Sequence, residues 1–327
     1  MTNSKIGWVA EVGLLIYPDC QLSAIYGLTD LFRIACEWSD GDASRSVRVT
    51  HWRAEDQGQP TCIWDSDPGQ PHRLDYVIAP PSIVMPGNMQ SMSEETEWLR
   101  ARHKEGSRMC SICAGAFVLA ESGLLHGRRV TTHWAFAKQL AERHADIEVA
   151  DRNLVLDDGD VISAGGILAW SDLGLTLVER FFGRSTMLST ARFLVVQPPR
   201  ASQLPFTEFI PDFDHSDAAI LRVQHHIHAD LAASLNLNDL AEVACLGKRT
   251  FMRRFSKVTS LNPTEYIQQA RVAKARSTLE LTNRPLDQIA WEVGYKDPSA
   301  FSKIFQRISG LTASEYRQQF GVLQGQT

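Results

Sequence analysis

The chain has 327 residues, of which 44% are hydrophobic and 22% are charged, and it carries a formal net charge of −5 at pH 7. This length exceeds what one ordinary hydrophobic core accommodates, so we expect two domains. The composition excludes a membrane-spanning protein, because no apolar run approaches the roughly 18 residues that a transmembrane helix needs, and the first residues lack the apolar segment of a secretory signal, so we expect a cytoplasmic protein.

Predicted strands and helices alternate through the first part of the chain. The apolar run at 10–17 stops at Pro18 and predicts a buried strand, and apolar residues recur at helical spacing in 22–38. Further strands are expected at 46–52, 74–80 and 107–113, and further helices at 95–106 and 114–122. Strands that alternate with helices indicate an α/β domain with a mainly parallel sheet, whose binding sites lie at the carboxyl ends of its strands.

Cys113 stands at such a strand end, immediately before small residues that begin the next helix. A turn of this kind displays a nucleophile, the helix start favours the thiolate, and His133 is the candidate base. Two other interpretations stay open: a pocket that senses a ligand, and a cysteine with a purely structural role. Cys110 forms a CxxC with Cys113, but along a strand their Cα atoms lie about 10 Å apart, too far for a disulfide. We therefore expect the six cysteines to be reduced.

The segment 112–134 resembles the ThiJ/PfpI group of the class I glutamine-amidotransferase-like superfamily, and 162–183 resembles a later segment of that group. The resemblance implies a flavodoxin-like domain with a parallel sheet. Catalytic relatives carry an acid in the first helix and a Gly-Gly pair after the third strand, where this chain has Ala24 and Pro81-Ser82. Pro81 has no N–H to offer an oxyanion hole. The resemblance therefore implies a sensor with no catalytic residue, and not an enzyme.

The expected ligand pocket combines the turn at Cys113 with two tryptophans. Trp134 follows His133, and Trp170 follows the Ser-Ala-Gly-Gly turn at 163–166. Aromatic faces hold a methylated or quaternary ammonium group, and the helix start at Ala114 suits a carboxylate. A role in the aromatic core is the alternative for each tryptophan. The residues expected to bind ligand are Cys113, Ala114, His133, Trp134 and Trp170.

Residues 196–215 contain four of the fourteen prolines and show little periodicity, so we expect them to link a domain at 1–195 to a second domain at 216–327. From residue 216 onward there are 14 Lys and Arg against 10 Asp and Glu, whereas residues 1–215 have 19 against 28. A mildly basic tail on an acidic body favours a nucleic-acid-binding module.

The last hundred residues contain a repeat. Identical residues recur fifty positions apart in five pairs: Phe251 and Phe301, Phe255 and Phe305, Leu261 and Leu311, Glu265 and Glu315, Tyr266 and Tyr316. Each copy predicts a short helix, a glycine turn and a second helix with a buried phenylalanine pair, which is typical of a helix-turn-helix. Residues 263–282 predict a rigid helix between the copies. A helical dimerisation module with a solvated charged face is the alternative.

Residues 240–320 resemble the AraC/XylS family of bacterial transcription regulators, most specifically at 289–312, with Ala313 where proline is commoner. In combination with the segment around Cys113 they resemble the GlxA-type regulators of that family. The resemblance implies DNA recognition in two successive major grooves. It also implies a small nitrogenous effector, such as an amino acid or a methylated or quaternary amine. The residues expected to contact DNA are Lys248, Arg249, Met252, Arg253, Arg254, Lys257, Ser299 and Lys303.

We further expect a homodimer that activates transcription, RNA polymerase as a candidate partner, and neither a cofactor nor a metal. The pair His225 and His228 has the spacing of metal ligands, but without an acidic or cysteine partner it is more typical of a solvated helix face. The alternative function is a cysteine-dependent hydrolase or lyase of the ThiJ/PfpI type with a DNA-binding tail. The sequence thus predicts an α/β sensor domain followed by an all-α domain with tandem helix-turn-helix subdomains.

Overall fold

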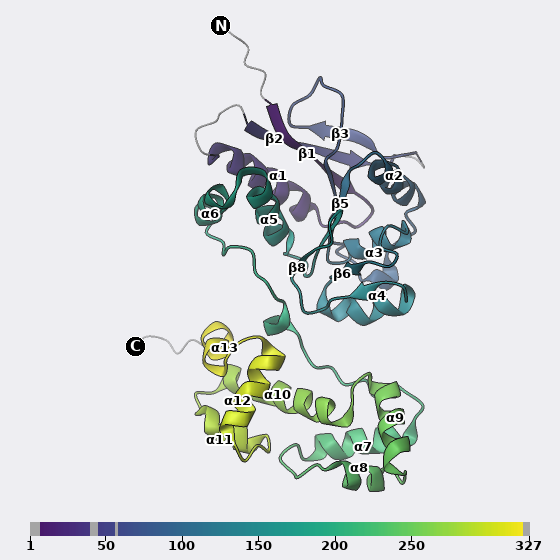
Figure 1. Ribbon diagram of the computed structural model, residues 1–327, viewed down its shortest axis with the longest axis vertical. Helices are drawn as coiled ribbons and strands as arrows, with labels where there is room; N and C mark the ends of the chain where they lie inside the picture. Colours follow the sequence, from purple (N-terminus) through teal and green to yellow (C-terminus); the bar gives the residue numbers. More distant parts are fainter. Residues whose placement is uncertain (1–6, 40–44, 56–57, 323–327) are drawn as a thin grey trace. The chain divides into compact units, whose positions relative to one another are not determined.

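The computed structural model describes residues 7–39, 45–55 and 58–322 and divides the chain into two units, Met1–Gln203 and Leu204–Thr327 (Figure 1). The boundary between the units falls inside the proline-rich stretch 196–215. Among the described residues, no helix has both the length and the apolar character that a membrane crossing requires.

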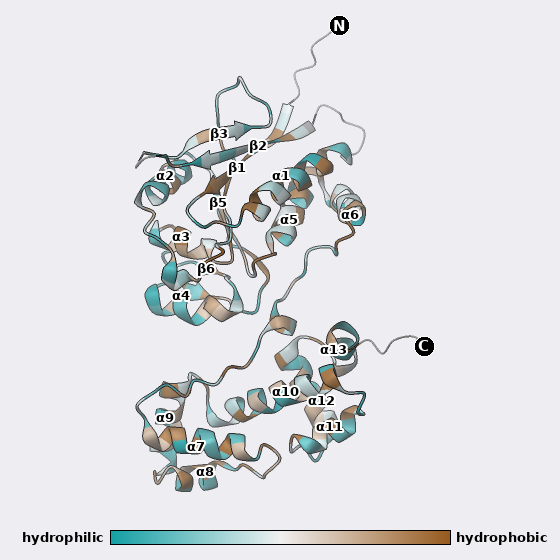
Figure 2. Cartoon of the chain, turned by 180° about the vertical axis from the view of Figure 1, so that it is seen from behind, coloured by the Kyte–Doolittle hydropathy of each residue, from teal (hydrophilic) through white to brown (hydrophobic). Residues whose placement is uncertain are grey.

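The first unit is built on a sheet whose strands, within the described residues, lie in the order β3-β2-β1-β4-β5-β9-β8. The neighbours from β2 to β9 are parallel, and the two edge strands are antiparallel. The strands are β1 Gly7–Ile16, β2 Arg45–Arg53, β3 Thr61–Asp65, β4 Tyr76–Ala79, β5 Arg108–Ile112, β8 Val155–Asp157 and β9 Val161–Ala164, with a separate short pair of β6 Arg129–Val130 and β7 Glu148–Val149. Every residue of β4 and β9 is buried, and Figure 2 shows β5 in the brown of hydrophobic residues. Burial on both faces is typical of parallel strands between helices, so the predicted α/β sheet is confirmed.

Helices cover both faces of this sheet (Figure 1). On one face lie α1 Leu22–Glu37, α5 Trp170–Phe182 and α6 Arg184–Phe193, and on the other lie α2 Ser93–Lys104, α3 Gly115–Glu121 and α4 Ala137–Arg143. Successive strand residues point to opposite faces, so in β4 Ile78 joins the apolar cluster under α1 and α5, whereas Val77 joins the cluster under α2 and α3. The sheet is thereby the middle layer of three.

The described part of the second unit is helical. After the 3₁₀ turn Leu204–Phe206 its helices are α7 Ala218–Ala229, α8 Leu237–Val243, α9 Lys248–Thr259, α10 Pro263–Leu281, α11 Leu286–Glu292, α12 Pro298–Ser309 and α13 Ala313–Phe320. The predicted phenylalanine pairs are fully buried in separate apolar clusters: Phe251 and Phe255 in the first, Phe301 and Phe305 in the second. Helix α10 contributes Tyr266 to the first cluster and Leu279 to the second. The tandem helix-turn-helix arrangement is confirmed.

The repeat extends to the helix starts. At α10 the Asn262 side chain accepts from the backbone N–H of Glu265, and at α13 the Thr312 side chain accepts from that of Glu315. In both places the glutamate accepts in return from the cap N–H, which satisfies two donors that a helix start otherwise leaves unpaired. This capping box starts α13 at Ala313 without the proline that is commoner there.

Candidate DNA-binding and ligand-binding sites

Cys113 occupies the sharp turn between β5 and α3. Its φ of 54° lies in the left-handed region, which residues other than glycine rarely adopt. The backbone N–H of Cys113 donates to the carbonyl oxygen of Ala164 at 2.7 Å, and its own carbonyl oxygen accepts from the Thr132 hydroxyl at 2.8 Å. A Cβ on Gly115 would lie 2.3 Å from the carbonyl oxygen of Ala79, so only glycine lets α3 approach the end of β4 this closely. The strand-to-helix turn has the geometry that the sequence predicts.

The thiol of Cys113 is buried and protonated. Cys113 is 2% exposed, and burial raises the pKa of its thiol to about 12, a shift that the backbone hydrogen bond at Ala114 opposes only in part. Burial also raises the pKa of Tyr17 well above its usual value, with further contributions from the neighbouring Cys20 and Cys113. The prediction that the helix start favours a thiolate is therefore wrong, because the cost of burying the charge exceeds the benefit of the helix start.

His133 is half-buried, and burial lowers the pKa of its imidazole. Its Nδ1 accepts from the backbone N–H of Ala135 at 3.1 Å, and its ring lies 5.4 Å from the ring of Trp134 and 5.1 Å from that of Phe136. Within the described residues, no hydrogen bond joins His133 to Cys113. The structure thus places the imidazole in an aromatic group and does not pair it with the thiol.

The two tryptophans of the expected pocket have different surroundings. Trp134 is half-buried beside His133, and its backbone N–H donates to the side-chain oxygen of Gln203 at 3.0 Å. Trp170 packs against α1 so closely that a Cβ on Gly27 would lie 2.6 Å from its ring. The Nε1 of Trp170 is buried and has no hydrogen-bond partner among the described residues. Trp170 is therefore half-buried and packs against the apolar cluster around α1, and in the described chain no ring contact joins it to Trp134.

Catalytic relatives complete their centre with residues from the first helix and from the loop after the third strand, and in this chain the corresponding segments contact each other. Ala24 is fully buried in the apolar cluster around α1. The carbonyl oxygen of Pro81 accepts from the backbone N–H of Gln21 at 2.7 Å, and Ser82 forms an antiparallel bridge with Cys20. The loop after β4 is thereby fastened to the loop that precedes α1.

The predicted DNA contacts lie on α9 and α12, the second helix of each helix-turn-helix. On α9, Lys248, Arg249, Met252, Arg253 and Lys257 are exposed. On α12, Ser299 and Lys303 are exposed, and the Asp297 side chain caps the start of the helix by accepting from the backbone N–H of Ser299 at 2.9 Å. Both helices thus present exposed polar or basic side chains to solvent, and Arg253 on α9 and Lys303 on α12 lie opposite the buried phenylalanines.

Arg254 differs from the rest of the predicted DNA-contacting set. Its Nε donates to one carboxylate oxygen of Asp217 at 2.8 Å and its Nη2 to the other at 2.6 Å. Asp217 also caps α7, and the hydrogen bond from Arg254 lowers the pKa of its carboxyl group. The guanidinium of Arg254 therefore fastens α9 to the start of α7.

Arg271, in the middle of α10, is a residue that the sequence analysis missed. Its guanidinium donates to the carbonyl oxygens of Leu231 and Ala233 at 2.9 Å and to that of Gly294 at 3.2 Å, and it lies 5.1 Å from the ring centroid of Tyr295. The first two acceptors belong to the first helix-turn-helix subdomain, and the third belongs to the second. The sequence feature that could have identified Arg271 is its position in the middle of the predicted connecting helix, between the two subdomains.

The histidines considered as metal ligands have aromatic partners. The ring of His225 stacks on Phe213, with 5.4 Å between centroids, and the Nε2 of His228 lies 3.0 Å from the Tyr266 hydroxyl. In the part of the chain that the structure describes, no cluster of three or more histidine, cysteine or acidic side chains suits a metal ion.

Two family models match the chain. The helix-turn-helix domain model matches residues 240–319, and the DJ-1/PfpI family model matches residues 70–180. The HTH-type transcriptional regulator GbdR of Pseudomonas aeruginosa is 24% identical over 319 residues, which cover 94% of this chain and 84% of the relative. Isonitrile hydratase of Pseudomonas putida is 30% identical over 242 residues, 69% of this chain and 98% of the hydratase. The solved structure of Drosophila melanogaster DJ-1beta covers 57% of this chain and 98% of its own, with 20% identity and a TM-score of 0.43. The chain belongs to the AraC-type helix-turn-helix transcriptional regulators that carry a DJ-1/PfpI domain ahead of their DNA-binding domain.

Proposed function

We propose that the protein reads a bipartite DNA site with its second unit and adjusts transcription in response to a small nitrogenous metabolite bound by its first unit. One observation carries the DNA part of this proposal: two exposed helices, α9 and α12, are joined by the continuous helix α10 and tied together through Arg271. Helix α10 has 19 residues, a length of about 28 Å. This suits two readers that enter major grooves about one helical turn, or 34 Å, apart.

The proposed DNA contacts are the exposed residues Lys248, Arg249, Met252, Arg253 and Lys257 of α9 and Ser299 and Lys303 of α12. Arg254 leaves the proposed set because its Nε and Nη2 donate to Asp217. Selection of bound duplexes from a random library, with the full chain, tests this arrangement. We expect two selected blocks whose centres lie about 10.5 base pairs apart. A single selected block would contradict simultaneous reading by both helices.

The proposed effector is an amino acid or a methylated amine, held beside the turn at Cys113. His133 and Trp134 offer adjacent half-buried rings there, and such faces attract alkylammonium groups. Trp170 leaves the proposed set, because its ring packs on Gly27. Calorimetry with betaine-like, carnitine-like and plain amino-acid ligands, on the wild type and on Trp134→Ala, tests the site. Equal affinity in both proteins would exclude an aromatic contact from Trp134.

The second candidate function is cysteine-dependent catalysis, favoured by the 30% identity to isonitrile hydratase. Three observations speak for binding without turnover: the pKa of the Cys113 thiol is raised to about 12, Ala24 stands where catalytic relatives carry an acid, and Pro81 has no N–H. Assays of isonitrile hydration, amide hydrolysis and glyoxalase activity test the alternative. Turnover that disappears in Cys113→Ala would establish the enzyme.

We propose a cytoplasmic homodimer that activates transcription and contacts RNA polymerase when bound to DNA. The first unit is the proposed dimer contact, since the second unit is committed to DNA. Sedimentation at micromolar concentration, with and without DNA, tests the assembly, and a monomer under both conditions would contradict it.

A further inference from the structure

A cleft of about 700 Å³ lies between α1, the edge strand β3 and its neighbour β2 in the first unit. This volume is within the range of small-molecule sites. Neither Cys113 nor His133 nor Trp134 lines the cleft, so it is separate from the effector site proposed above. Its lining includes aromatic and acidic side chains: Trp8, Trp64, Asp30, Glu37 and Asp67.

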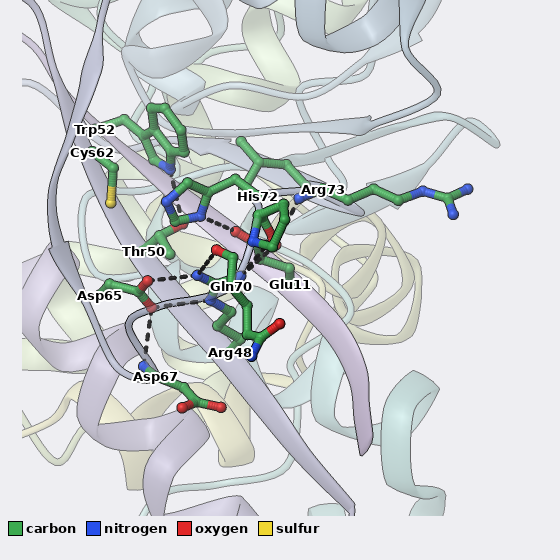
Figure 3. Close-up of polar contacts among 12 residues, drawn as sticks. Glu11, Arg48, Thr50, Trp52, Cys62, Asp65, Asp67, Gln70, His72 and Arg73 are labelled. Atoms are coloured by element: carbon green, nitrogen blue, oxygen red, sulfur yellow. Dashed lines mark hydrogen bonds and ion pairs between the residues drawn. The ribbon is translucent and has the colours of Figure 1, made fainter. Parts of the chain in front are cut away.

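Arg48, in the wall formed by β2, is buried, and each of its guanidinium N–H groups has an acceptor. Arg48 is 1% exposed. Its Nε and Nη2 donate to the two carboxylate oxygens of Asp65 at 3.0 and 2.6 Å, and its Nη1 donates to Glu11 at 3.4 Å. The carbonyl oxygens of Gln70 and Pro71 take the remaining N–H groups at 2.9 and 3.0 Å. Figure 3 shows Asp65, Gln70 and Glu11 around this guanidinium, whose charge is thus balanced by the buried Glu11 and the partly buried Asp65 and is not offered to a ligand.

Both tryptophan rings are held in place. The guanidinium of Arg48 lies 4.6 Å from the ring centroid of Trp8, and the Trp8 Nε1 donates to Asp67 at 2.9 Å. Trp64 stacks on the ring of His51 with 4.5 Å between centroids, yet it remains 42% exposed. Burial lowers the pKa of His51 to about 4, so the imidazole behind Trp64 is neutral at pH 7. The face of Trp64 thus borders the cleft with a neutral imidazole behind it, whereas the ring of Trp8 already has the guanidinium of Arg48 beside it.

The charge of the lining favours a cation. Asp30 and Glu37 belong to α1, and Asp67 follows β3. Two arginines among the described residues line the cleft. The charge of Arg48 is neutralised by Glu11 and Asp65, so Arg33 is the one that opposes the three carboxylates. Asp30 and Glu37 take part in no ion pair among the described residues. Carboxylates accept charge-assisted hydrogen bonds from an ammonium group, and an aromatic face attracts its positive charge.

We infer that this cleft binds a small organic ammonium ion, a protonated amine whose N–H groups are accepted by Asp30, Glu37 and Asp67 and whose apolar part lies against Trp64. The site is additional to the effector site at Trp134, and it does not depend on the DNA-binding proposal. The first unit would then bind two small molecules at separate sites: the proposed effector near Trp134 and an organic ammonium ion in this cleft.

Calorimetry on the full chain with n-pentylammonium chloride tests the inference, with 1-pentanol as the uncharged analogue. We expect saturable binding of the ammonium ion at a single site and no binding of the alcohol. The double variant Asp30→Asn/Glu37→Gln should weaken binding at least tenfold. The matched control Glu121→Gln removes one exposed carboxylate of α3 and should leave the affinity unchanged. Choline, which has the charge but no N–H, should bind more weakly than n-pentylammonium.

The inference is overturned if the alcohol binds as tightly as the ammonium ion, if choline matches it, or if no probe binds at millimolar concentration. It is also overturned if the double variant binds like the wild type while Trp134→Ala loses binding, since the amine would then occupy the effector site instead. Trp64→Leu should weaken binding severalfold. Should that variant fail to fold, the carboxylate variant still decides, because Asp30 and Glu37 are exposed.

Discussion

Replacing Arg271 by methionine removes the hydrogen bonds that tie the two helix-turn-helix subdomains together, while the aliphatic part of the side chain is kept. Three carbonyl acceptors lose their donor: those of Leu231 and Ala233 at 2.9 Å and that of Gly294 at 3.2 Å. A hydrogen bond to a charged donor contributes about 1.5–3 kcal/mol when buried, and about 1 kcal/mol each is appropriate for this half-buried side chain. The three lost hydrogen bonds are therefore worth about 3 kcal/mol in all. At most two of them cross between the subdomains, so the lost coupling is at most about 2 kcal/mol, the equivalent of about 30-fold in an equilibrium constant.

The subdomains keep their own cores in Arg271→Met, because the phenylalanine pairs are untouched. We therefore expect the affinity for a bipartite operator to fall at least tenfold, while the affinity for random DNA changes little. Fluorescence anisotropy with operators of different block spacing measures this, and the variant should also tolerate altered spacing better than the wild type. Lys274→Met, an exposed position on the same helix, is the control. Wild-type affinity together with wild-type spacing dependence in Arg271→Met would refute the reasoning.

Three further predictions concern single side chains. Arg253→Ala should cost about 1–3 kcal/mol and relax specificity at one base pair, whereas Lys257→Ala should weaken all sequences alike and reduce the salt dependence; unchanged operator and random-DNA affinities in Arg253→Ala would show that its assigned contact is wrong. Because the pKa of the Cys113 thiol is about 12, iodoacetamide near neutral pH should label the exposed Cys245 and spare Cys113, as mass spectrometry of peptides can establish; rapid labelling of Cys113 would contradict its burial. Burial lowers the pKa of His51 from 6.5 to about 4, so the unfolded chain binds this proton first, and about 3 kcal/mol of unfolding free energy that is present above pH 6.5 is lost as the pH falls toward 4. Urea unfolding at pH 7 and near pH 4 should show a smaller loss in His51→Phe than in the wild type, and an equal loss would exclude His51 as the cause.

Local periodicity was enough to predict the helices of the second unit. Phe251 and Phe255 lie one helical turn apart, so they share a face, and the same spacing recurs at Phe301 and Phe305. Burial of a helix face with two phenylalanines is strongly favourable, and all four are fully buried in the structure. The apolar run at 10–17 likewise predicted a buried strand, and Ala10–Leu15 of β1 are buried in the structure.

The state of individual side chains depended on partners that are distant in sequence. Arg254 has the appearance of a DNA contact in a basic helix, yet its partner Asp217 lies 37 residues earlier. Trp170 packs on Gly27, which belongs to a different helix and has no sequence pattern that announces the contact. Periodicity describes which face of an element is buried, but it does not describe which element covers that face.

The turn at Cys113 shows most clearly the difference between what the local sequence predicts and what depends on the tertiary structure. Its backbone follows from the sequence, because an apolar strand that runs into small residues can turn sharply, and Gly115 permits the close approach to Ala79. Its chemistry does not follow from the sequence, since the pKa of the thiol depends on how completely surrounding elements exclude water. Dehydration of a charge is a sum over everything nearby in space, including Tyr17 of the loop after β1, and it outweighs the local field of one helix start. The sequence alone thus determined the fold and the family, and only the tertiary structure decided that this thiol is protonated, which arginines contact protein, and where a cleft with aromatic and acidic walls lies.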